Sequence, residues 1–409
     1  MEQRVQCCIA GGGPAGMMLG VLLARAGVKV LVLEKHADFL RDFRGDTVHP
    51  STMQVLHELG WLDEFLTIPH EPVRHLRARF GETTVQLADL SHLAAAAPFI
   101  AMIPQWDFLN FLAGKGRAYA GFELLMEAEV RSLIIENGCV TGVSVETSKG
   151  ALTVGADLVV AADGRTSTLR KAAGLKSETF GAPMDALWFR LPRLATDSAQ
   201  MQARFDSGSI FIMLNRGDYW QCAFVIPKGA NARVRSEGLA AFQKSVGALV
   251  PFEAARAASI ENFDDVKLLV VQVDRLTSWS RPGLLCIGDA AHAMSPVGGV
   301  GINLAIQDAV ATANLLSAPL RDGQLTDGDV ERVQARREWP TKATQRLQLV
   351  MQNTIIAPAL SGKGRIKPPL ALRLLTGLPV LSRIPARILG LGFRPEHVAD
   401  FIRDGQGTD

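Results

Sequence analysis

The sequence has few cysteines and no pattern that would organise them. Five cysteines occur among 409 residues, an odd number, and no two have the CxxC spacing of a zinc or redox pair. This argues against a disulfide framework and a zinc site, and it favours a reduced, cytoplasmic compartment. Cys7 and Cys8 stand together in an apolar run, where free cysteine packs as a small hydrophobe.

An excess of charge is also missing. The chain has 43 Lys and Arg against 41 Asp and Glu, a net charge of +2. Bulk electrostatics therefore predict neither a nucleic-acid partner nor an acidic membrane surface. The most apolar stretch, residues 5–35, is interrupted by glycine and proline where an export signal or a membrane span would need a continuous helix. We expect a globular chain with no integral membrane segment, long enough for more than one domain.

The N-terminal residues have the pattern of strand, helix and strand. Residues 4–10 and 28–35 are apolar runs typical of buried strands, and residues 14–27 between them have helical apolar spacing. Such a β-α-β unit begins a parallel sheet. Further along, residues 129–164 suggest a strand meander and residues 209–227 a hairpin. Other expectations are a helix from Ser51, whose spacing to Gln54 fits a capping box, a helix capped by Asp107, a buried strand over 268–274, and helices after residue 302.

The turn after the first strand carries the dinucleotide-binding pattern GxGxxG. Its first glycine allows a tight turn, its second lets a pyrophosphate approach the backbone, and its third lets helix and strand pack closely. Glu34 ends the second strand, eighteen residues after Gly16, where an acid suits a ribose 2′-hydroxyl and disfavours a 2′-phosphate. The pattern predicts FAD or NAD rather than NADP. The predicted contacts are Gly11, Gly13, Pro14, Ala15, Gly16, Glu34 and Lys35.

Two more strand runs end in an acid beside a glycine. The first ends at Asp163–Gly164 with Arg165 and Arg170 close behind, and the second ends at Gly288–Asp289. A carboxylate at the carboxyl end of a parallel strand faces the ligand crevice. The stretch SPVGGVGIN, residues 295–303, then exposes backbone amides before a helix whose N-terminus would direct partial positive charge at a ligand. Each motif alone could instead be an ordinary capped helix start.

Together and in this order, the three motifs resemble those of the para-hydroxybenzoate hydroxylase-fold FAD-dependent aromatic monooxygenases. The resemblance covers roughly two thirds of the chain, and GFRPEH at 392–397 is similar to small members without a thioredoxin-like C-terminal domain. It implies an α/β fold in which a Rossmann-like, glutathione-reductase-like parallel sheet is interleaved with an antiparallel-sheet substrate domain and followed by a helical C-terminus. The implied FAD-binding domain is 1–72, 99–178 and 271–350, the substrate-binding domain 73–98 and 179–270, and the helical segment 351–409.

The resemblance also implies roles for single residues. The adenosine and pyrophosphate end would be held by the glycine motif, Glu34 and Val130. The ribityl chain and phosphates would be held by Arg44, Gln105, Asp163, Gly288 and Asp289. The flavin ring would lie against Pro296, Gly299, Gly301, Ile302 and Asn303.

Two histidines and a proline are candidates for the chemistry. His49 could point at the flavin ring or simply enter a helix, and Pro296 would lie near ring and substrate. His292 could act as a base, but a structural role is the preferred interpretation.

The implied chemistry needs no protein metal and no triad. NADH or NADPH reduces FAD, oxygen adds to give a flavin C4a-hydroperoxide, and the distal oxygen hydroxylates an aromatic or similarly activated hydrophobic molecule. Alternation predicts a substrate pocket on the hairpin, although the same alternation fits plain core packing. The residues concerned are Phe211, Met213, Trp220, Cys222 and Phe224.

Three other functions compete with this one. YWQCAFVIP at 219–227 resembles the WxWxIP stretch of flavin-dependent halogenases, but it has one Trp, with Ala223–Phe224 where the second is expected. A polyprenyl or quinone-pathway reductase would fit the apolar tail. A flavin-binding sensor without turnover is the third, and the complete set of motifs argues against it. The sequence leaves monomer and homodimer equally open.

Overall fold

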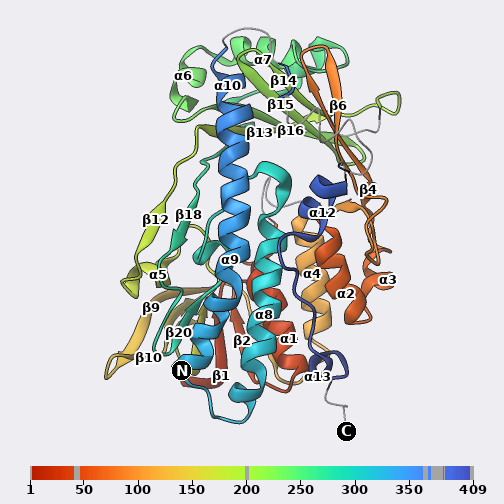
Figure 1. The fold of residues 1–409 in the computed structure, drawn as a ribbon. Helices are drawn as coiled ribbons and strands as arrows, with labels where there is room; N and C mark the ends of the chain where they lie inside the picture. The colour runs from red at the N-terminus through yellow and green to blue at the C-terminus, as the bar shows by residue number, and fades with distance from the viewer. Residues whose placement is uncertain are drawn as a thin grey trace.

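The computed structural model describes residues 2–40, 47–198, 202–362, 367–369, 381 and 383–405 (Figure 1). Within these residues, an eight-stranded sheet has the strand order β19-β20-β11-β1-β2-β8. Strands β20, β11, β1, β2 and β8 are parallel to one another, β19 pairs antiparallel with β20, and β10 and β9 extend the sheet antiparallel from β11. The last four residues of β1 and of β11 and all of β2 and β20 are buried, as expected for apolar runs covered on both faces. The strands are β1 Glu2–Ala10, β2 Val30–Leu33, β8 Phe122–Leu125, β9 Ala128–Glu136, β10 Cys139–Thr147, β11 Gly150–Ala161, β19 Ser280–Arg281 and β20 Leu284–Cys286.

Three helices form the layer against this sheet. Helix α1 (Pro14–Arg25) contacts both α4 (Gln105–Gly116) and α8 (Gly301–Arg321), and the three lie side by side in Figure 1. Small residues bring α1 close to the sheet: a Cβ on Gly20 would lie 2.6 Å from Val32 Cγ2. The parallel sheet and its helices confirm the predicted α/β architecture.

A second sheet of seven strands lies at the other end of the molecule, in the order β17-β13-β16-β15-β14-β5-β6 among the described residues. Strands β5 and β14 pair in parallel, which joins residues 75–89 to residues 184–227 in one sheet. Figure 1 shows α6 (Asn231–Ser236) and α7 (Leu239–Gly247) on its outer face. The strands are β5 His75–Phe80, β6 Thr83–Asp89, β13 Met184–Pro192, β14 Gln202–Asp206, β15 Ser209–Asn215, β16 Tyr219–Pro227 and β17 Lys267–Leu269.

One long helical stretch connects the two sheets. Helix α9 (Asp327–Met351) begins at a capping box of Thr326 and Asp329 and continues through the π-helical turn η5 (Gln352–Ile356) into α10 (Ala357–Leu360). It contacts β19 near one end and β15 through α10 at the other. The smaller elements are β3 Thr47–Val48, α2 Pro50–Glu58, α3 Leu62–Phe65, β4 Glu71–Val73, β7 Ile100–Met102, α5 Thr168–Ala172, β12 Ser177–Thr179, η1 Ala254–Ser259, η2 Phe263–Asp265, β18 Asp274–Leu276, η3 Gly288–Ala290, η4 Val297–Gly299, α12 Arg383–Leu391 and α13 Asp400–Arg403.

Both predicted helices form, but their predicted cap residues, Ser51 and Asp107, are wrong, and so is one predicted strand. Helices α2 and α4 begin one or two residues earlier than their predicted caps, after His49 and Pro104, and neither N-cap residue accepts a side-chain hydrogen bond. Pro50 explains the first, because proline is well suited to the first helical turn. Residues 268–274 do not form one strand: β17 joins the seven-stranded sheet, and β18 pairs with β12 instead.

No helix in the described ranges has both the length and the apolar character that crossing a bilayer requires.

The predicted domain boundaries stay a prediction.

Candidate cofactor and active site

The three sequence motifs meet at one edge of the parallel sheet. Strands β1, β11 and β20 are neighbours and run in the same direction, so their carboxyl ends lie together. Backbone hydrogen bonds continue the register past the strands, from Ala162 N to Ala10 O at 2.8 Å and from Ile287 N to Ala161 O at 3.0 Å. This edge is where a parallel sheet binds ligands.

The glycines of the first motif differ in what surrounds them. A Cβ on Gly11, whose φ is +110°, would lie 2.4 Å from Ala162 O, and one on Gly16 would lie 2.0 Å from Gly11 O. A Cβ on Gly13 would meet nothing within 4 Å. Gly13 is the N-cap residue of helix α1 and has no side chain to cap it, so the first amides of α1 stay available to an anion. Pro14 and Ala15 are the first two residues of that helix.

Glu34 directly follows strand β2 at this edge of the sheet. It is buried at the end of β2 and accepts hydrogen bonds from Gly12 N at 3.0 Å and His36 N at 3.1 Å. Ala128 N donates to Glu34 O, which brings the start of β9, and half-buried Val130 two residues on, alongside. Lys35 is exposed, and Arg44 lies outside the described residues.

The second motif combines a helix cap with groups that lack partners. Asp163 Oδ2 accepts from Thr168 N, the first amide of α5, at 2.8 Å, but the N-cap of α5 is Ser167, whose Oγ accepts from Arg170 N at 3.0 Å, and not Asp163 or Thr166 as the ordinary interpretation of this motif predicts. Its buried Oδ1 has no hydrogen-bond partner among the described residues, nor has buried Nη1 of Arg165. Arg165 Nε donates to Asp289 Oδ2 at 2.9 Å, which links the second and third motifs. Arg170 turns away into the protein, toward Asp274 and Ala290 O.

The glycine loop before α8 is held from the α2 side. Thr47 Oγ1 donates to Gly299 O at 2.9 Å, and Asn303 Oδ1 accepts from His49 N at 3.0 Å and Thr52 Oγ1 at 2.7 Å. A Cβ on Gly301, the first residue of α8, would meet nothing within 4 Å. Ile302 is buried, and Pro296 and Gln105 are half-buried.

A row of glutamines holds the same loop from the α9 side. Gln348 Nε2 donates to Ser295 O and Val297 O, both at 2.9 Å, and Gln352 Nε2 donates to Ser295 Oγ at 2.6 Å. Gln345 Nε2 donates to Ala293 O at 3.2 Å. Sequence reasoning missed these residues. Their spacing of three and four places them on one helix face, but glutamine is ordinary on an exposed helix and drew no attention.

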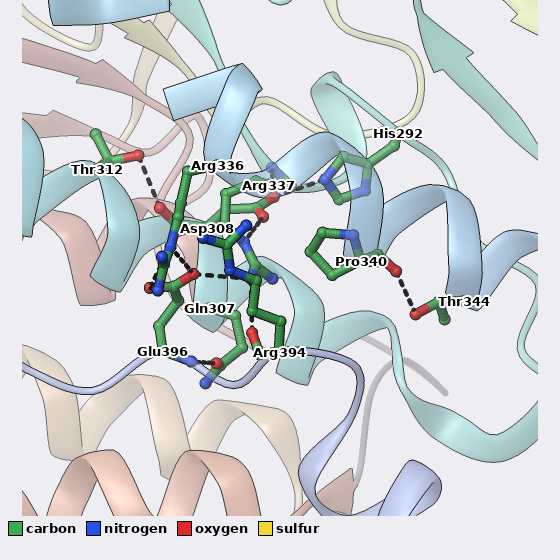
Figure 2. A network of polar contacts seen from close by, with 11 residues as sticks. His292, Gln307, Asp308, Thr312, Arg336, Arg337, Pro340, Thr344, Arg394 and Glu396 are labelled. Atoms are coloured by element: carbon green, nitrogen blue, oxygen red, sulfur yellow. Dashed lines mark hydrogen bonds and ion pairs between the residues drawn. The ribbon is translucent and has the colours of Figure 1, made fainter. Parts of the chain in front are cut away.

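His292 belongs to a buried ionic network behind the third motif (Figure 2). Its Nε2 lies 2.6 Å from Asp308 Oδ2, which also accepts from Gly288 N at 3.1 Å. Arg337 Nε donates to Asp308 Oδ1 at 3.0 Å, and Arg337 Nη1 reaches Glu396 Oε1 at 3.2 Å. The histidine and its ion pairs lie in the protein interior, which supports the structural role preferred from sequence.

The five predicted pocket residues gather on one face of the hairpin, but that face is turned away from the glycine loop. They pack with Phe242 and Val246 of α7 and with Ala257 of η1. Trp220 Nε1 donates to Asp197 Oδ2 at 3.0 Å. The structure thus favours the alternative interpretation, plain core packing. On the opposite face, Ile210 and Val225 belong to a cluster that half-buried Val297 of the loop packs against.

The comparisons with known proteins agree with this geometry. The family described as FAD binding domain matches residues 4–344. The chain belongs to this FAD-binding family. It is 33% identical over 384 residues to 6-methylpretetramide 4-monooxygenase of Streptomyces rimosus, covering 93% of this chain and 89% of that one. This similarity makes the protein an FAD-dependent monooxygenase.

Solved structures share the fold of this FAD-dependent monooxygenase. The anhydrotetracycline hydroxylase OxyS of Streptomyces rimosus aligns with a TM-score of 0.74 and 24% identity over 97% of this chain and 78% of that one. The flavin-dependent halogenase CmlS aligns with a TM-score of 0.73 and 19% identity over 96% of this chain and 74% of that one. At these identities the likeness concerns the fold.

The residues present fit FAD. The open space at Gly13, the uncapped starts of α1 and α8, and the unpartnered polar atoms of Asp163 and Arg165 form a cradle along the sheet edge. When bound, FAD supplies the redox chemistry that activates oxygen with electrons from a nicotinamide. The protein's part would be to hold the phosphates at α1, to place dipoles and amides at the ring end, and to exclude water with the apolar sheet.

Proposed function

We propose that this protein hydroxylates a polycyclic aromatic phenol of the polyketide type, using NADH or NADPH and oxygen. The observation that carries the proposal is the similarity to 6-methylpretetramide 4-monooxygenase along nearly the whole of both chains. We also propose that the predicted FAD contacts act as described above, including Glu34 at the ribose and Asp289 at the ribityl chain.

The inner face of the seven-stranded sheet supports the proposal that the substrate is flat and hydrophobic. Half-buried Ile212 lies on this face. Ile210 and Val225 lie beside it, buried in a cluster with Ile356 and Ala359 of the long helical stretch, and Val297 of the glycine loop packs against that cluster. Broad apolar walls with few polar groups bind flat aromatic molecules by excluding water from them. We assign the substrate wall to this face and not to the face of Phe211 and Met213.

The position of Trp220 weighs against halogenation. Trp220, which carried the likeness to the halogenase motif, is fully buried on the outer face and bonded to Asp197. It therefore lies on the side of the sheet away from the glycine loop. The polyprenyl reductase alternative rests on the apolar tail, much of which lies outside the described residues.

The test is oxygen uptake with NADH or NADPH in the presence of tetracyclic phenols, simple phenols and prenylated quinone precursors. We expect a tetracyclic phenol to stimulate uptake and to gain one oxygen atom by mass spectrometry, labelled when ¹⁸O₂ is used. Reduction of a prenyl chain without oxygen uptake, or a product that requires chloride, would contradict the proposal.

We further propose a cytoplasmic enzyme that acts without nucleic acid, as a monomer or homodimer. All five cysteines are free thiols. Burial raises the pKa of the Cys8 thiol to about 12, which keeps it inert. Sedimentation of the purified protein would decide between monomer and dimer.

A further inference from the structure

The first residues of the glycine loop, 295–297, take their backbone partners from one side chain of α9. Gln348 Oε1 accepts from Ser295 N at 3.2 Å, and Gln348 Nε2 donates to Ser295 O and Val297 O, both at 2.9 Å. A primary amide has two hydrogens to donate, so both are used, and the backbone partners fix which end of the amide is which. Gln348 thus serves this segment as a neighbouring strand would serve an edge strand.

A second glutamine holds the same segment from one turn further along the helical stretch. Gln352 Nε2 donates to Ser295 Oγ at 2.6 Å, and Ser295 Oγ also accepts from Val297 N at 3.3 Å. Ser295 and both glutamines are buried, so water does not compete for these hydrogen bonds. Pro296, which lies between the two bonded residues, is therefore held in position from both sides.

The helical stretch is fixed to the seven-stranded sheet just beyond these glutamines. Ile356 and Ala359 are buried in one cluster with Ile210 of β15 and Val225 of β16. Ala359 O also accepts from Gly208 N, in the turn before β15, at 2.8 Å. In Figure 1 the stretch runs as one rod from the parallel sheet to the seven-stranded sheet. It therefore holds the loop and the sheet at two adjacent places.

The turn between these two sets of contacts is π-helical. It is η5, which begins at Gln352, bonded to the loop, and ends at Ile356, packed on the sheet. The N–H of Ala357 donates to the carbonyl oxygen of Gln352, five residues earlier. A π-helical turn is rare and is frequently found at functional sites. Because it is wider than an α-helical turn, it changes which side chains share a face of the helix, and one stretch can contact both loop and sheet.

We propose that α9, η5 and α10 form a spacer that sets the distance between residues 295–297 and the substrate wall, with Gln348 and Gln352 as positioning residues for oxygen transfer. Val297 is the point of contact, because it belongs to the segment that the glutamines hold and packs against the cluster beside the wall. A displacement of about 1 Å between reacting groups can cost about 100-fold in rate. A spacer that fixes this distance therefore controls whether oxygen is delivered to the substrate.

This inference rests on the proposed function, because it concerns the transfer of oxygen to the phenol. When transfer occurs, the reduced nicotinamide, a proton, O₂ and the phenol give the oxidised nicotinamide, the hydroxylated phenol and water. When the phenol is misplaced, the reduced nicotinamide, a proton and O₂ give the oxidised nicotinamide and hydrogen peroxide, and the phenol is unchanged. The ratio of hydrogen peroxide to hydroxylated product therefore measures placement. It does not depend on how much of the protein is folded, so a purely structural role of the glutamines would leave it unchanged.

The test measures this ratio in the full-length, FAD-loaded enzyme with NADH or NADPH and a tetracyclic phenol that stimulates oxygen uptake. Gln348→Met keeps the length of the side chain and removes three hydrogen bonds, and it should raise the ratio about tenfold. Gln352→Met removes one hydrogen bond and should raise the ratio less. Gln334→Met is the matched control, because Gln334 also bonds backbone from α9, at Trp279 N and Thr277 O, but away from the loop. Its ratio should equal that of the wild type.

A further variant tests whether the glutamines act through the contact between loop and sheet. Val297→Ala removes part of that contact and should also raise the ratio. In the double variant with Gln348→Met the two effects should not multiply, because both act on the same distance.

Three results would overturn the inference. A folded Gln348→Met variant with the wild-type ratio would show that the glutamine supports the fold alone. An equal effect of Gln334→Met would indicate a general loosening of α9, and multiplied effects in the double variant would show that Gln348 and Val297 act separately. If Gln348→Met does not fold, Gln352→Met and Val297→Ala decide by the same ratio. A wild-type enzyme that hydroxylates none of the phenols would instead overturn the proposed function, and the inference with it, before any variant is compared.

Discussion

The three glycines of the GxGxxG turn are needed for different reasons. Gly11 and Gly16 are required by the protein itself, because a Cβ on either would lie within 2.4 Å of a backbone oxygen. Gly13 is surrounded by open space and is therefore required only if something binds there. The structure thus separates residues that build the loop from the residue that leaves room for the cofactor.

The two kinds of glycine should respond differently to alanine. Gly16→Ala should lower the free energy of unfolding by about 3 kcal/mol or more, because a backbone oxygen must move. Gly13→Ala should change it by less than about 1 kcal/mol, yet weaken FAD binding at least tenfold, an order-of-magnitude expectation for blocking the phosphates. Urea unfolding of the FAD-free protein and FAD titration measure the two effects. Equal FAD affinity in Gly13→Ala would show that the phosphates do not approach there.

His49 predicts a specific dependence of stability on pH. Its pKa is about 4 in the folded protein and 6.5 in its ordinary range, so between these values the unfolded chain binds more protons. Stability should be complete above pH 6.5 and should decrease as the pH falls toward 4, by about 3 kcal/mol in total. The buried carboxyls of Asp185 and Asp308 have pKa values below their usual 3.8, so they act chiefly at lower pH.

Urea unfolding at pH 7.0 and pH 4.5 would measure this, with His49→Gln as the control that cannot titrate. The difference between the two pH values should be smaller in the variant. Identical pH dependence in both proteins would mean that His49 is not buried in its neutral form.

At the scale of elements, helix α8 makes two sets of contacts in its first half, one at its start and one at Asp308. Its start supports the glycine loop, and two turns further on Asp308 holds Gly288 N, His292 and Arg337 together (Figure 2). Hydrogen bonds from Arg337 to Glu396 Oε1 and to Arg394 O continue this network to the C-terminal segment. Helices α8 and α9 and the GFRPEH segment are therefore connected through one buried ionic centre behind the cofactor site.

Removing the charge partner from this centre should be costly. Arg337→Ala leaves two buried carboxylates with fewer partners and should lower the free energy of unfolding by about 3–5 kcal/mol. Lys342→Ala, on the same helix, breaks only the partly exposed pair with Glu338 and should cost less than about 1 kcal/mol. Chemical denaturation compares the two, and similar losses would show that the buried network is not a centre of stability.

At the scale of the whole molecule, the seven-stranded sheet separates a packing face from a binding face. Its outer face is covered by α7 and η1, and its inner face is turned toward the glycine loop and α12 (Figure 1). The long helical stretch of α9, η5 and α10 contacts both sheets and keeps them together. The active site is thus formed between parts of the chain that are far apart in sequence.

Neighbouring residues on β15 test this division. Met213→Ala, on the outer face, should lower the free energy of unfolding by about 2–5 kcal/mol and leave the substrate KM unchanged, because a buried core side chain is lost. Ile212→Ala, on the inner face, should raise the substrate KM several-fold with a smaller loss of stability, because Ile212 is only half-buried. A KM effect confined to Met213→Ala would reverse the assignment of the two faces.

The sequence by itself determined the strand, loop and helix at each motif, and the order of the motifs identified the family. Those features depend on neighbours within a few residues, such as the glycines that permit a turn and the apolar runs that require burial. Alternation along the hairpin also correctly grouped Phe211, Met213, Trp220, Cys222 and Phe224 on one face.

Only the tertiary structure decided which face of the sheet meets the cofactor loop, which glutamines of α9 hold that loop, and that the carbonyl oxygen of Leu389 contacts His49 Nδ1. Because side chains alternate between the two faces of a strand, the sequence shows which of them share a face. It does not show what will cover that face. Gln348 and Leu389 lie 53 and 340 residues from their partners. Contacts over such separations depend on the packing of the whole chain, and no local pattern records them.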